Sequence, residues 1–346
     1  MSSGGEDWKA LRKRFNPGFA PQHLMTLLPS IVETATIFIN HLDSFARNME
    51  EFSLQSLATN LTFDVIGKLV LDNDMGAQRS RPSEFMRVFH ELIQTFTSEQ
   101  IDLPWWCTPR LEWKRSCLAK QVRSTLETII RDAYAERNED TKPCSILSMS
   151  LQDVDDLSPD IMDVTCDQLS SFLFAGHDTT STTIAWVIYE LSRTPHALRA
   201  VRAELDEIFS PDSSPAAGAS HLLVPGGEQL VHRMSYASAV IKEMLRLWPP
   251  GATARMTKPG DGLKITLRTS EDSSGTERWL QDDIADKIPA GAWRAFERDP
   301  CNCIGQELAT IEARIVIELA ARRYDFTKVG LGAVTLDNST DKAGDV

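Results

Sequence analysis

The feature of this sequence that most constrains its fold is the helical spacing of its apolar residues. In the stretch 54–71, for example, Phe63, Ile66 and Leu69 fall on one face of a helix. Pro29 is expected to divide another stretch into a short turn and a longer helix that it opens. Helices are therefore expected at residues 6–14, 24–49, 54–71, 84–96, 118–136, 159–193, 197–209, 235–247 and 306–323.

The segments between these helices have a different composition. Residues 210–227 are rich in Ser, Pro, Ala and Gly, which predicts a surface loop. After Pro250 the stretch 263–267 alternates like a strand, and 324–327 is a second predicted strand. The polar stretches 269–276 and 281–286 show no clear period. We therefore expect β structure only near the C-terminal end.

Charge and cysteine usage exclude some classes of partner. The chain has 49 acidic and 36 basic side chains, a formal net charge of −13. Phosphate binding needs a basic surface, so this charge argues against a nucleic-acid partner. The six cysteines have no framework spacing, which favours a reducing compartment over a disulfide scaffold. No signal peptide and no run of about eighteen apolar residues is visible.

An aromatic pair, Trp105 and Trp106, lies in the loop before the predicted helix at 118–136. The pair has two interpretations. It plugs the core, or it forms a tip that dips into a membrane or borders a substrate entrance, because Trp favours interfaces. The sequence alone leaves both open.

The predicted helix at 159–193 contains residues that break local helix propensity. Gly176 is followed by a run of Thr and Ser that ends at Thr183, and these are poor helix formers. Such a break is typical of a place where the backbone ladder opens to admit water or a ligand. Asp178 and Thr179 are suited to relay protons there. A kink with internally bonded hydroxyls is the alternative, and the clustering of Gly, Asp and Thr favours function.

Two further pairs have helical spacing. Trp8 and Arg12 are four residues apart, so they share one helix face. On these residues alone a surface aromatic–cation pair is favoured over a site that donates to a carboxylate or phosphate. Glu243 and Arg246 are three apart and meet on one face, but an isolated pair of this kind is too common to be evidence of function.

Cys303 lies in the stretch FERDPCNCIG (296–305), just before the predicted helix at 306–323. Unpaired N–H groups and the helix dipole favour an anion there, which lowers a cysteine's pKa and favours the iron-binding thiolate. The alternative is an ordinary buried cysteine. A metal or redox site formed by Cys301 and Cys303 is a weaker hypothesis, because two ligands are too few for structural zinc.

In their order along the chain, these motifs resemble one family, the haem-thiolate monooxygenases or cytochromes P-450, in its fungal secondary-metabolism branch. The resemblance extends over nearly the whole chain, with 269–286 the least similar part. It is carried by WKALR (8–12), AGHDTT (175–180), EMLR (243–246), PPGATAR (249–255) and FERDPCNCIGQELA (296–309).

The resemblance implies a fold and a set of site residues. The fold is mainly α with a small β region, formed by one domain at residues 1–338, truncated at its N-terminus and internally, with a frayed tail at 339–346. Cys303 would be the axial iron ligand, and haem the cofactor. Phe296 would shield the sulfur, and Gly305 would let the helix start lie close to the porphyrin. The other implied site residues are Trp8, Arg12 and Arg255 at the propionates, Ala175 and Gly176 beside dioxygen, Asp178 and Thr179 as proton donors, and Glu243 and Arg246 in the haem-binding core.

The resemblance also implies a reaction. One oxygen atom from dioxygen is inserted into an apolar small-molecule substrate, in secondary-metabolite biosynthesis, with electrons from an NADPH-dependent reductase. Family members usually lie on the endoplasmic reticulum membrane. Because no anchor is visible in this chain, a cytoplasmic location is expected for it as written.

The chain departs from the family pattern near the ligand and before it. Asp299 replaces a Gly and Cys301 replaces an Arg, which removes a charged hydrogen bond to a propionate worth roughly 1.5–3 kcal/mol. The sequence also runs from Gly291 directly to Trp293, without the family's longer segment. We therefore expect the Glu243–Arg246 pair to lack its usual third partner. A non-catalytic remnant that does not retain haem is the alternative function.

Overall fold

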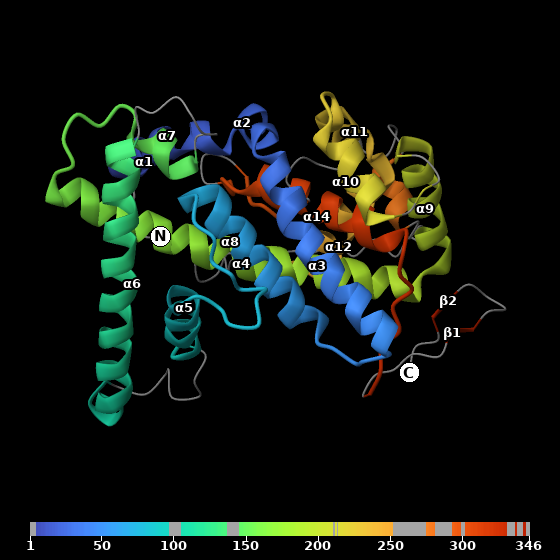
Figure 1. Cartoon of the computed structure of the whole chain (residues 1–346), viewed down its shortest axis with the longest axis horizontal. Helices are drawn as coiled ribbons and strands as arrows, with labels where there is room; N and C mark the ends of the chain where they lie inside the picture. Colours follow the sequence, from blue (N-terminus) through green and yellow to red (C-terminus); the bar gives the residue numbers. More distant parts are fainter. Residues whose placement is uncertain are drawn as a thin grey trace, which may run out of the picture. The chain divides into compact units, whose positions relative to one another are not determined.

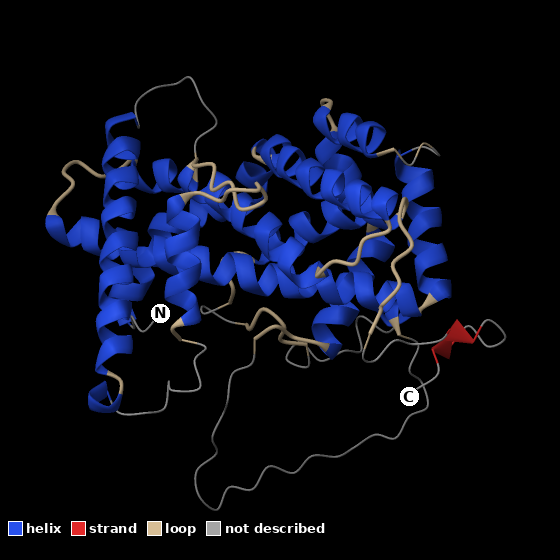
Figure 2. Ribbon diagram, turned by 60° about the horizontal axis from the view of Figure 1, so that its bottom comes forward, coloured by secondary structure: helices blue, strands red, loops and turns tan. Residues whose placement is uncertain are grey.

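The computed structural model describes residues 5–96, 105–136, 145–209, 212, 214–251, 275–280, 293–298, 302–330, 336–337 and 342–343. Its secondary structure is mostly helical (Figure 2), which confirms the expected mainly α fold. The chain divides into two compact units. One consists of Met1–Ser181 with Glu307–Ala309, and the other of Thr182–Gln306 with Thr310–Val346.

The first unit is built of helices that follow the predicted stretches closely. They are α1 (Gly5–Phe15), η1 (Asn16–Phe19), α2 (Pro21–Thr26), α3 (Leu28–Asn48), α4 (Leu54–Leu71), α5 (Glu84–Gln94), η2 (Trp105–Cys107), α6 (Pro109–Glu136), α7 (Ile146–Leu151) and α8 (Pro159–Arg193). The last residues of α8, from Thr182 onward, belong to the second unit.

Local signals set several helix starts. Pro29 stands in the first turn of α3, as expected, and the Ser53 hydroxyl accepts a hydrogen bond from Ser56 N at 3.3 Å to cap α4. Helix α6 begins at Pro109, earlier than the predicted start at Leu118. The reason is that the buried residues of α6 begin only at Leu118, so the apolar period gives no sign of its first turns.

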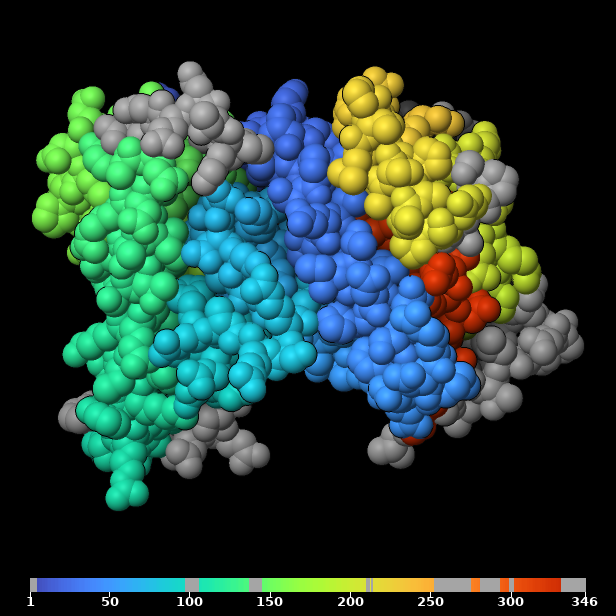
Figure 3. All heavy atoms as spheres, viewed as in Figure 1, coloured from blue at the N-terminus to red at the C-terminus, as the bar shows by residue number. Residues whose placement is uncertain are grey.

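The core of the first unit lies mainly between α3 and α4, which pack side by side (Figure 1). The large side chains there are fully buried, among them Ile31, Phe38, Leu61 and Leu69. Helices α5 and α6 pack against each other and form adjoining bands of the surface (Figure 3). Burial of such apolar surface is the main term that stabilises the unit.

The exposure of Trp106 decides part of the question about the aromatic pair. The Trp106 side chain is 65% exposed, so it does not plug the core. The side chain of Trp105 lies outside the described residues. Among the described helices, none combines the length and the low polarity that crossing a membrane requires.

The second unit combines shorter helices with irregular segments. Its elements are α9 (Pro195–Phe209), α10 (Pro215–Leu223), α11 (Gly227–Arg233), α12 (Ser235–Leu247), η3 (Thr276–Trp279), α14 (Gln306–Ala321), β1 (Leu336–Asp337) and β2 (Lys342–Ala343). Strands β1 and β2 pair antiparallel, with Leu336 opposite Ala343.

Two sequence predictions in this unit are wrong. The expected loop at 210–227 contains α10, which Ser214 caps by accepting a hydrogen bond from Ala217 N at 3.3 Å, and α11 starts at its end. The cap and the Pro after it outweigh the loop-like composition. The expected strand at 324–327 is irregular, because Arg202 Nη2 donates to the Tyr324 carbonyl at 3.1 Å in place of a strand partner. The predicted strand at 263–267 lies outside the described residues.

Candidate active site

The central part of α8 presents predicted site residues on one face. Ala175, Asp178 and Thr179 are exposed, and their spacing places them one turn apart. The Thr179 hydroxyl donates to the Ala175 carbonyl at 2.7 Å, and the Ser181 hydroxyl donates to the Asp178 carbonyl at 2.9 Å. The helix is continuous from Pro159 to Arg193, so the expected break at the Gly–Thr stretch is not seen. Internal hydroxyl bonds keep these poor helix formers in the helix.

Gly176 lies on the side of α8 that contacts α4. A Cβ at Gly176 would lie 2.7 Å from Cδ1 of Ile66, so only glycine fits without a shift of that side chain. Beside it, the Thr62 hydroxyl donates to the His177 carbonyl at 2.7 Å. Close packing on α4 therefore fixes the height and rotation of the exposed face.

His177 was not singled out from the sequence, and it is buried among aromatic rings. The ring centroids of Phe63 and Phe89 lie 5.4 and 6.1 Å from its imidazole, and Nδ1 lies 2.7 Å from the Leu173 carbonyl. Burial lowers the pKa of His177, so the neutral imidazole is favoured. Nδ1 then donates to that carbonyl, and the ring acts as packing rather than as a charge.

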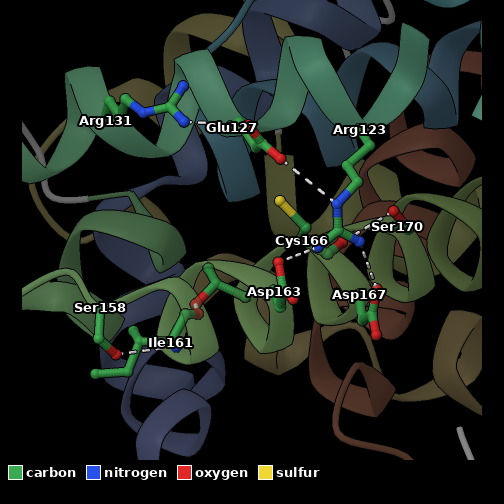
Figure 4. A network of polar contacts seen from close by, with 10 residues as sticks. Arg123, Glu127, Arg131, Ser158, Ile161, Asp163, Cys166, Asp167 and Ser170 are labelled. Carbon is green, nitrogen blue, oxygen red and sulfur yellow. Dashed lines mark hydrogen bonds and ion pairs between the residues drawn. The ribbon is translucent and has the colours of Figure 1, made fainter. Parts of the chain in front are cut away.

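The N-terminal half of α8 is attached to α6 by Arg123 (Figure 4). The guanidinium of Arg123 forms ion pairs with Asp163, with Asp167 at 3.5 Å and with Glu127 at 3.5 Å. Cys166 lies beside this network, and burial raises the pKa of its thiol to about 11. Cys166 therefore stays protonated, and the cluster serves to connect two helices.

Helix α1 carries the predicted pair Trp8 and Arg12. Both side chains are half-buried and lie one turn apart. Two residues further along, Arg14 donates to the Ser150 carbonyl and to the Thr165 hydroxyl, each at 2.9 Å. Burial lowers the pKa of Arg14. Arg14 thus fixes α1 to α7 and α8, in the same unit as the exposed face of α8.

Cys303 belongs to the second unit. It is exposed, and its N–H donates to the Phe296 carbonyl at 2.8 Å. Gly305 is the N-cap of α14, and the nearest atom to a Cβ built there is the Cys303 sulfur at 4.0 Å. Glu297 has a φ of +56°, a left-handed conformation that is uncommon for such a residue. The sulfur therefore lies beside the N-terminal end of α14.

Glu243 and Arg246 form a bidentate pair on α12, with both N–O distances 2.8 Å. The expectation that this pair lacks a third partner is wrong. Trp279 Nε1 donates to Glu243 at 3.0 Å, and Arg278 Nε lies 3.7 Å from the same carboxylate. Burial acts to raise the pKa of Glu243, but these hydrogen bonds and positive charges outweigh it, and the pKa is lowered.

Helix α14 carries buried carboxyl groups with few partners. Burial raises the pKa of Glu312 well above its ordinary value, and Oε1 of this residue has no hydrogen-bond partner among the described residues. Burial also raises the pKa of Glu318 to about 7, against the opposing effect of Arg322 at 3.4 Å. Both groups are favoured in the neutral form at mildly acidic pH.

The structure brings the predicted residues into two groups. Trp8, Arg12 and the α8 residues lie in the first unit, whereas Phe296, Cys303 and Gly305 lie in the second. Arg255, Asp299 and Cys301 lie outside the described residues. Within the described part of the chain, no cluster of His, Cys, Asp or Glu is arranged to hold a metal ion by itself.

The cytochrome P-450 family matches residues 1–261, most of the chain. The chain belongs to this family. The matched part includes the Trp8–Arg12 pair, the AGHDTT stretch of α8 and the Glu243–Arg246 pair, and it ends before Cys303. Membership of the cytochrome P-450 family implies a thiolate-ligated haem, a small-molecule substrate, oxygen and a redox partner.

Two fungal relatives extend the match beyond residue 261. The cytochrome P-450 monooxygenase acrF of Aspergillus aculeatus is 28% identical, over 94% of this chain and 74% of the relative. The monooxygenase polC of Polytolypa hystricis is 26% identical, over 94% of this chain and 64% of the relative. By this resemblance the chain is a cytochrome P-450 monooxygenase of fungal type. A crystal structure of a cytochrome P-450 has the same fold, with a TM-score of 0.75 at 18% identity, over 99% of this chain and 77% of that one.

The residues of this cytochrome P-450 fit a thiolate-ligated haem. Cys303 is exposed at a helix N-terminus, where the dipole favours the thiolate. Gly305 adds no side chain beside the sulfur. In the first unit, an exposed face with Ala175 and Thr179 remains available on α8.

Proposed function

We propose that this chain is a haem-thiolate monooxygenase that inserts one oxygen atom from dioxygen into an apolar small molecule. The proposal places it in secondary-metabolite biosynthesis, with an NADPH-dependent reductase as electron donor. Its main support is the position of Cys303, which is exposed at the N-terminal end of α14. When bound, the haem iron supplies the activation of dioxygen that protein side chains cannot supply.

In this proposal, the chain's own groups hold and orient the cofactor. The Cys303 thiolate would bind the iron, and Phe296, whose carbonyl accepts from Cys303 N–H, would shield the sulfur. Trp8, Arg12 and Arg255 would donate to the propionates, in charge-assisted hydrogen bonds to carboxylates. Glu243 and Arg246 hold the surrounding core of the second unit together.

The proton donors of the proposed reaction are Asp178 and Thr179. Asp178 is exposed and can exchange protons with water. The Thr179 hydroxyl donates to the Ala175 carbonyl, which fixes the position of its oxygen on the exposed face. The small Ala175 leaves room beside it, and Gly176 lets α8 lie close enough to α4 to hold this face still.

A second candidate is a non-catalytic remnant that does not retain haem. It is favoured by Asp299 and Cys301, which stand where the family pattern has Gly and Arg. Loss of that Arg removes one charged hydrogen bond to a propionate, worth roughly 1.5–3 kcal/mol.

The reduced carbon monoxide complex separates the two candidates. The protein is purified with haem supplied, reduced and exposed to carbon monoxide, and the Soret region is recorded. A band of the thiolate-ligated carbonyl type is the result expected for the monooxygenase. A folded protein that retains no haem, or shows no such band, supports the remnant. With a positive band, incorporation of labelled oxygen from dioxygen into an apolar substrate then tests the reaction itself.

A further inference from the structure

A row of aromatic rings joins the Cys303 loop to the rest of the second unit. Trp293 is the middle ring of this row. Its centroid lies 6.1 Å from that of Phe296, with an interplanar angle of 67°, and 5.8 Å from that of Trp279, with an angle of 66°. Both are edge-to-face arrangements, in which aromatic rings attract each other beyond their buried area.

The row is attached to α12 by the indole N–H groups of Trp279 and Trp293. Trp293 Nε1 donates to the Lys242 carbonyl at 3.3 Å, and Trp279 Nε1 donates to the Glu243 carboxylate at 3.0 Å. Lys242 and Glu243 are consecutive residues, and Glu243 is almost fully buried. The row is therefore fixed to a helix that cannot move independently of the core.

The Phe296 end of the row reaches Cys303 through the backbone. The carbonyl of Phe296 accepts the Cys303 N–H at 2.8 Å. Next to Phe296, Glu297 has a positive φ, and its carboxylate accepts hydrogen bonds from the Arg294 guanidinium. A loop without regular structure depends on such contacts for its position.

We propose that Trp293 is a positioning residue that holds the Cys303 loop against α12. Only an indole supplies both the ring contacts to Phe296 and Trp279 and the N–H that reaches the Lys242 carbonyl. Through Phe296, Trp293 fixes the backbone from which the Cys303 sulfur projects. The consequence for ligation rests on the proposed function, because a thiolate must stand at one position to bind iron.

Amide hydrogen exchange in the protein without haem tests the positional part. Trp293→Ala removes the ring contacts and the hydrogen bond, whereas Trp293→Phe keeps a ring and removes the donor. Exchange at residues 302–305 is expected to become about tenfold faster or more in Trp293→Ala, and less so in Trp293→Phe. Exchange in the centre of α14 is expected to stay unchanged. Trp113→Ala, which removes an indole that is 72% exposed in the first unit, is the matched control and leaves 302–305 unaffected.

The haem-loaded protein provides a spectroscopic readout. Trp293→Ala is expected to convert a large part of the reduced carbon monoxide complex from the thiolate type to the type without thiolate, and Trp113→Ala is not. If wild-type protein binds no haem, the proposed function fails while the exchange result still decides the role of Trp293.

The proposal is overturned if a folded Trp293→Ala protein shows wild-type exchange at 302–305. If Trp293→Ala does not fold, the same comparison is made with Trp293→Phe, and wild-type exchange in that variant overturns the proposal. Faster exchange with an unchanged Soret band would overturn the link between the loop's position and ligation.

Discussion

The centre of α8 and the Cys303 loop hold their functional groups in different ways. On α8, Asp178 and Thr179 project from a continuous helix whose opposite face packs closely on α4. Cys303 projects from an irregular backbone that depends on the Phe296 carbonyl, the Trp293 ring and a few side chains from distant parts of the sequence. The first region is positioned by the core, and the second by individual contacts.

Because of this difference, substitutions in the two regions should have different consequences. On α8 an exposed side chain can be replaced without disturbing its support, because the support lies on the other face of the helix. Near Cys303 the supporting contacts are made by side chains that can themselves be substituted. A substitution there is therefore expected to move the Cys303 sulfur. Each of the following predictions tests one side of this comparison.

The largest effect is expected at Glu243, which supports the Cys303 side. Glu243→Ala leaves Arg246 and the Trp279 N–H without their acceptor, at a cost of about 3 kcal/mol in the free energy of unfolding. Denaturant unfolding measures this cost. Glu6→Ala is the control, because Glu6 pairs with Lys9 on the surface and contributes less than about 0.5 kcal/mol. Equal effects of the two substitutions would contradict the account of α12 as an anchor.

A pH-dependent effect is expected at Glu318 on α14. Burial raises its pKa from 4.5 to about 7 in the folded protein, so the folded state binds the proton more tightly than the unfolded state does. The stabilisation is complete below pH 4.5, and is lost as the pH rises through about 7. The loss is on the order of 3–4 kcal/mol.

Glu318→Gln is expected to remove this dependence, because an amide does not titrate. The free energy of unfolding is measured from pH 4 to pH 8 for the variant and for Glu207→Gln, which changes an exposed carboxyl in the same unit. A wild-type slope that persists in Glu318→Gln would show that another group causes it.

Thr179→Ala is expected to change the chemistry and leave stability intact. Loss of the hydroxyl should lower product formation roughly a hundredfold, the usual contribution of a positioned proton-transfer group, while NADPH is still consumed. The free energy of unfolding should change by less than about 0.5 kcal/mol. Thr128→Ala is the matched control, because Thr128 makes the same hydroxyl-to-carbonyl bond on the exposed side of α6, at 3.1 Å. A comparable loss of product in Thr128→Ala would remove the argument for Thr179.

A smaller effect on stability is expected at Gly176. The methyl group of Gly176→Ala would contact Ile66, and relief of this contact should cost about 1 kcal/mol after the gain in helix propensity. Gly251→Ala, where a Cβ meets nothing within 4 Å, is the control. In a double-mutant cycle, Ile66→Ala should cancel the penalty of Gly176→Ala. No coupling between the two would show that α8 and α4 are not in close contact there.

The sequence predicts the α8 region better than the Cys303 region, because local signals determine a helix and contacts between distant segments position the Cys303 loop. Helical period and local start signals are written in neighbouring residues, so α4 and α8 begin and end where expected. The partners of Glu243 are Arg278 and Trp279 of η3, and no feature of the sequence singled out either residue. Contacts between distant segments are not encoded in local spacing.

Other differences from expectation have equally local causes. The loop-like composition of residues 210–227 led to the prediction of a loop in place of α10, although Ser214 and Pro215 are an ordinary helix start. The Gly–Thr stretch of α8 was expected to break the helix. It does not, because hydroxyls such as that of Thr179 bond within the helix.

The most direct test of the central claim, that Cys303 is the thiolate ligand, is the reduced carbon monoxide spectrum of Cys303→His. An imidazole can still bind iron, so the variant should retain haem while its Soret band moves from the thiolate type to the nitrogen type. Cys107→Ser, which changes another exposed cysteine, should keep the thiolate band. A thiolate band that persists in Cys303→His would contradict the account.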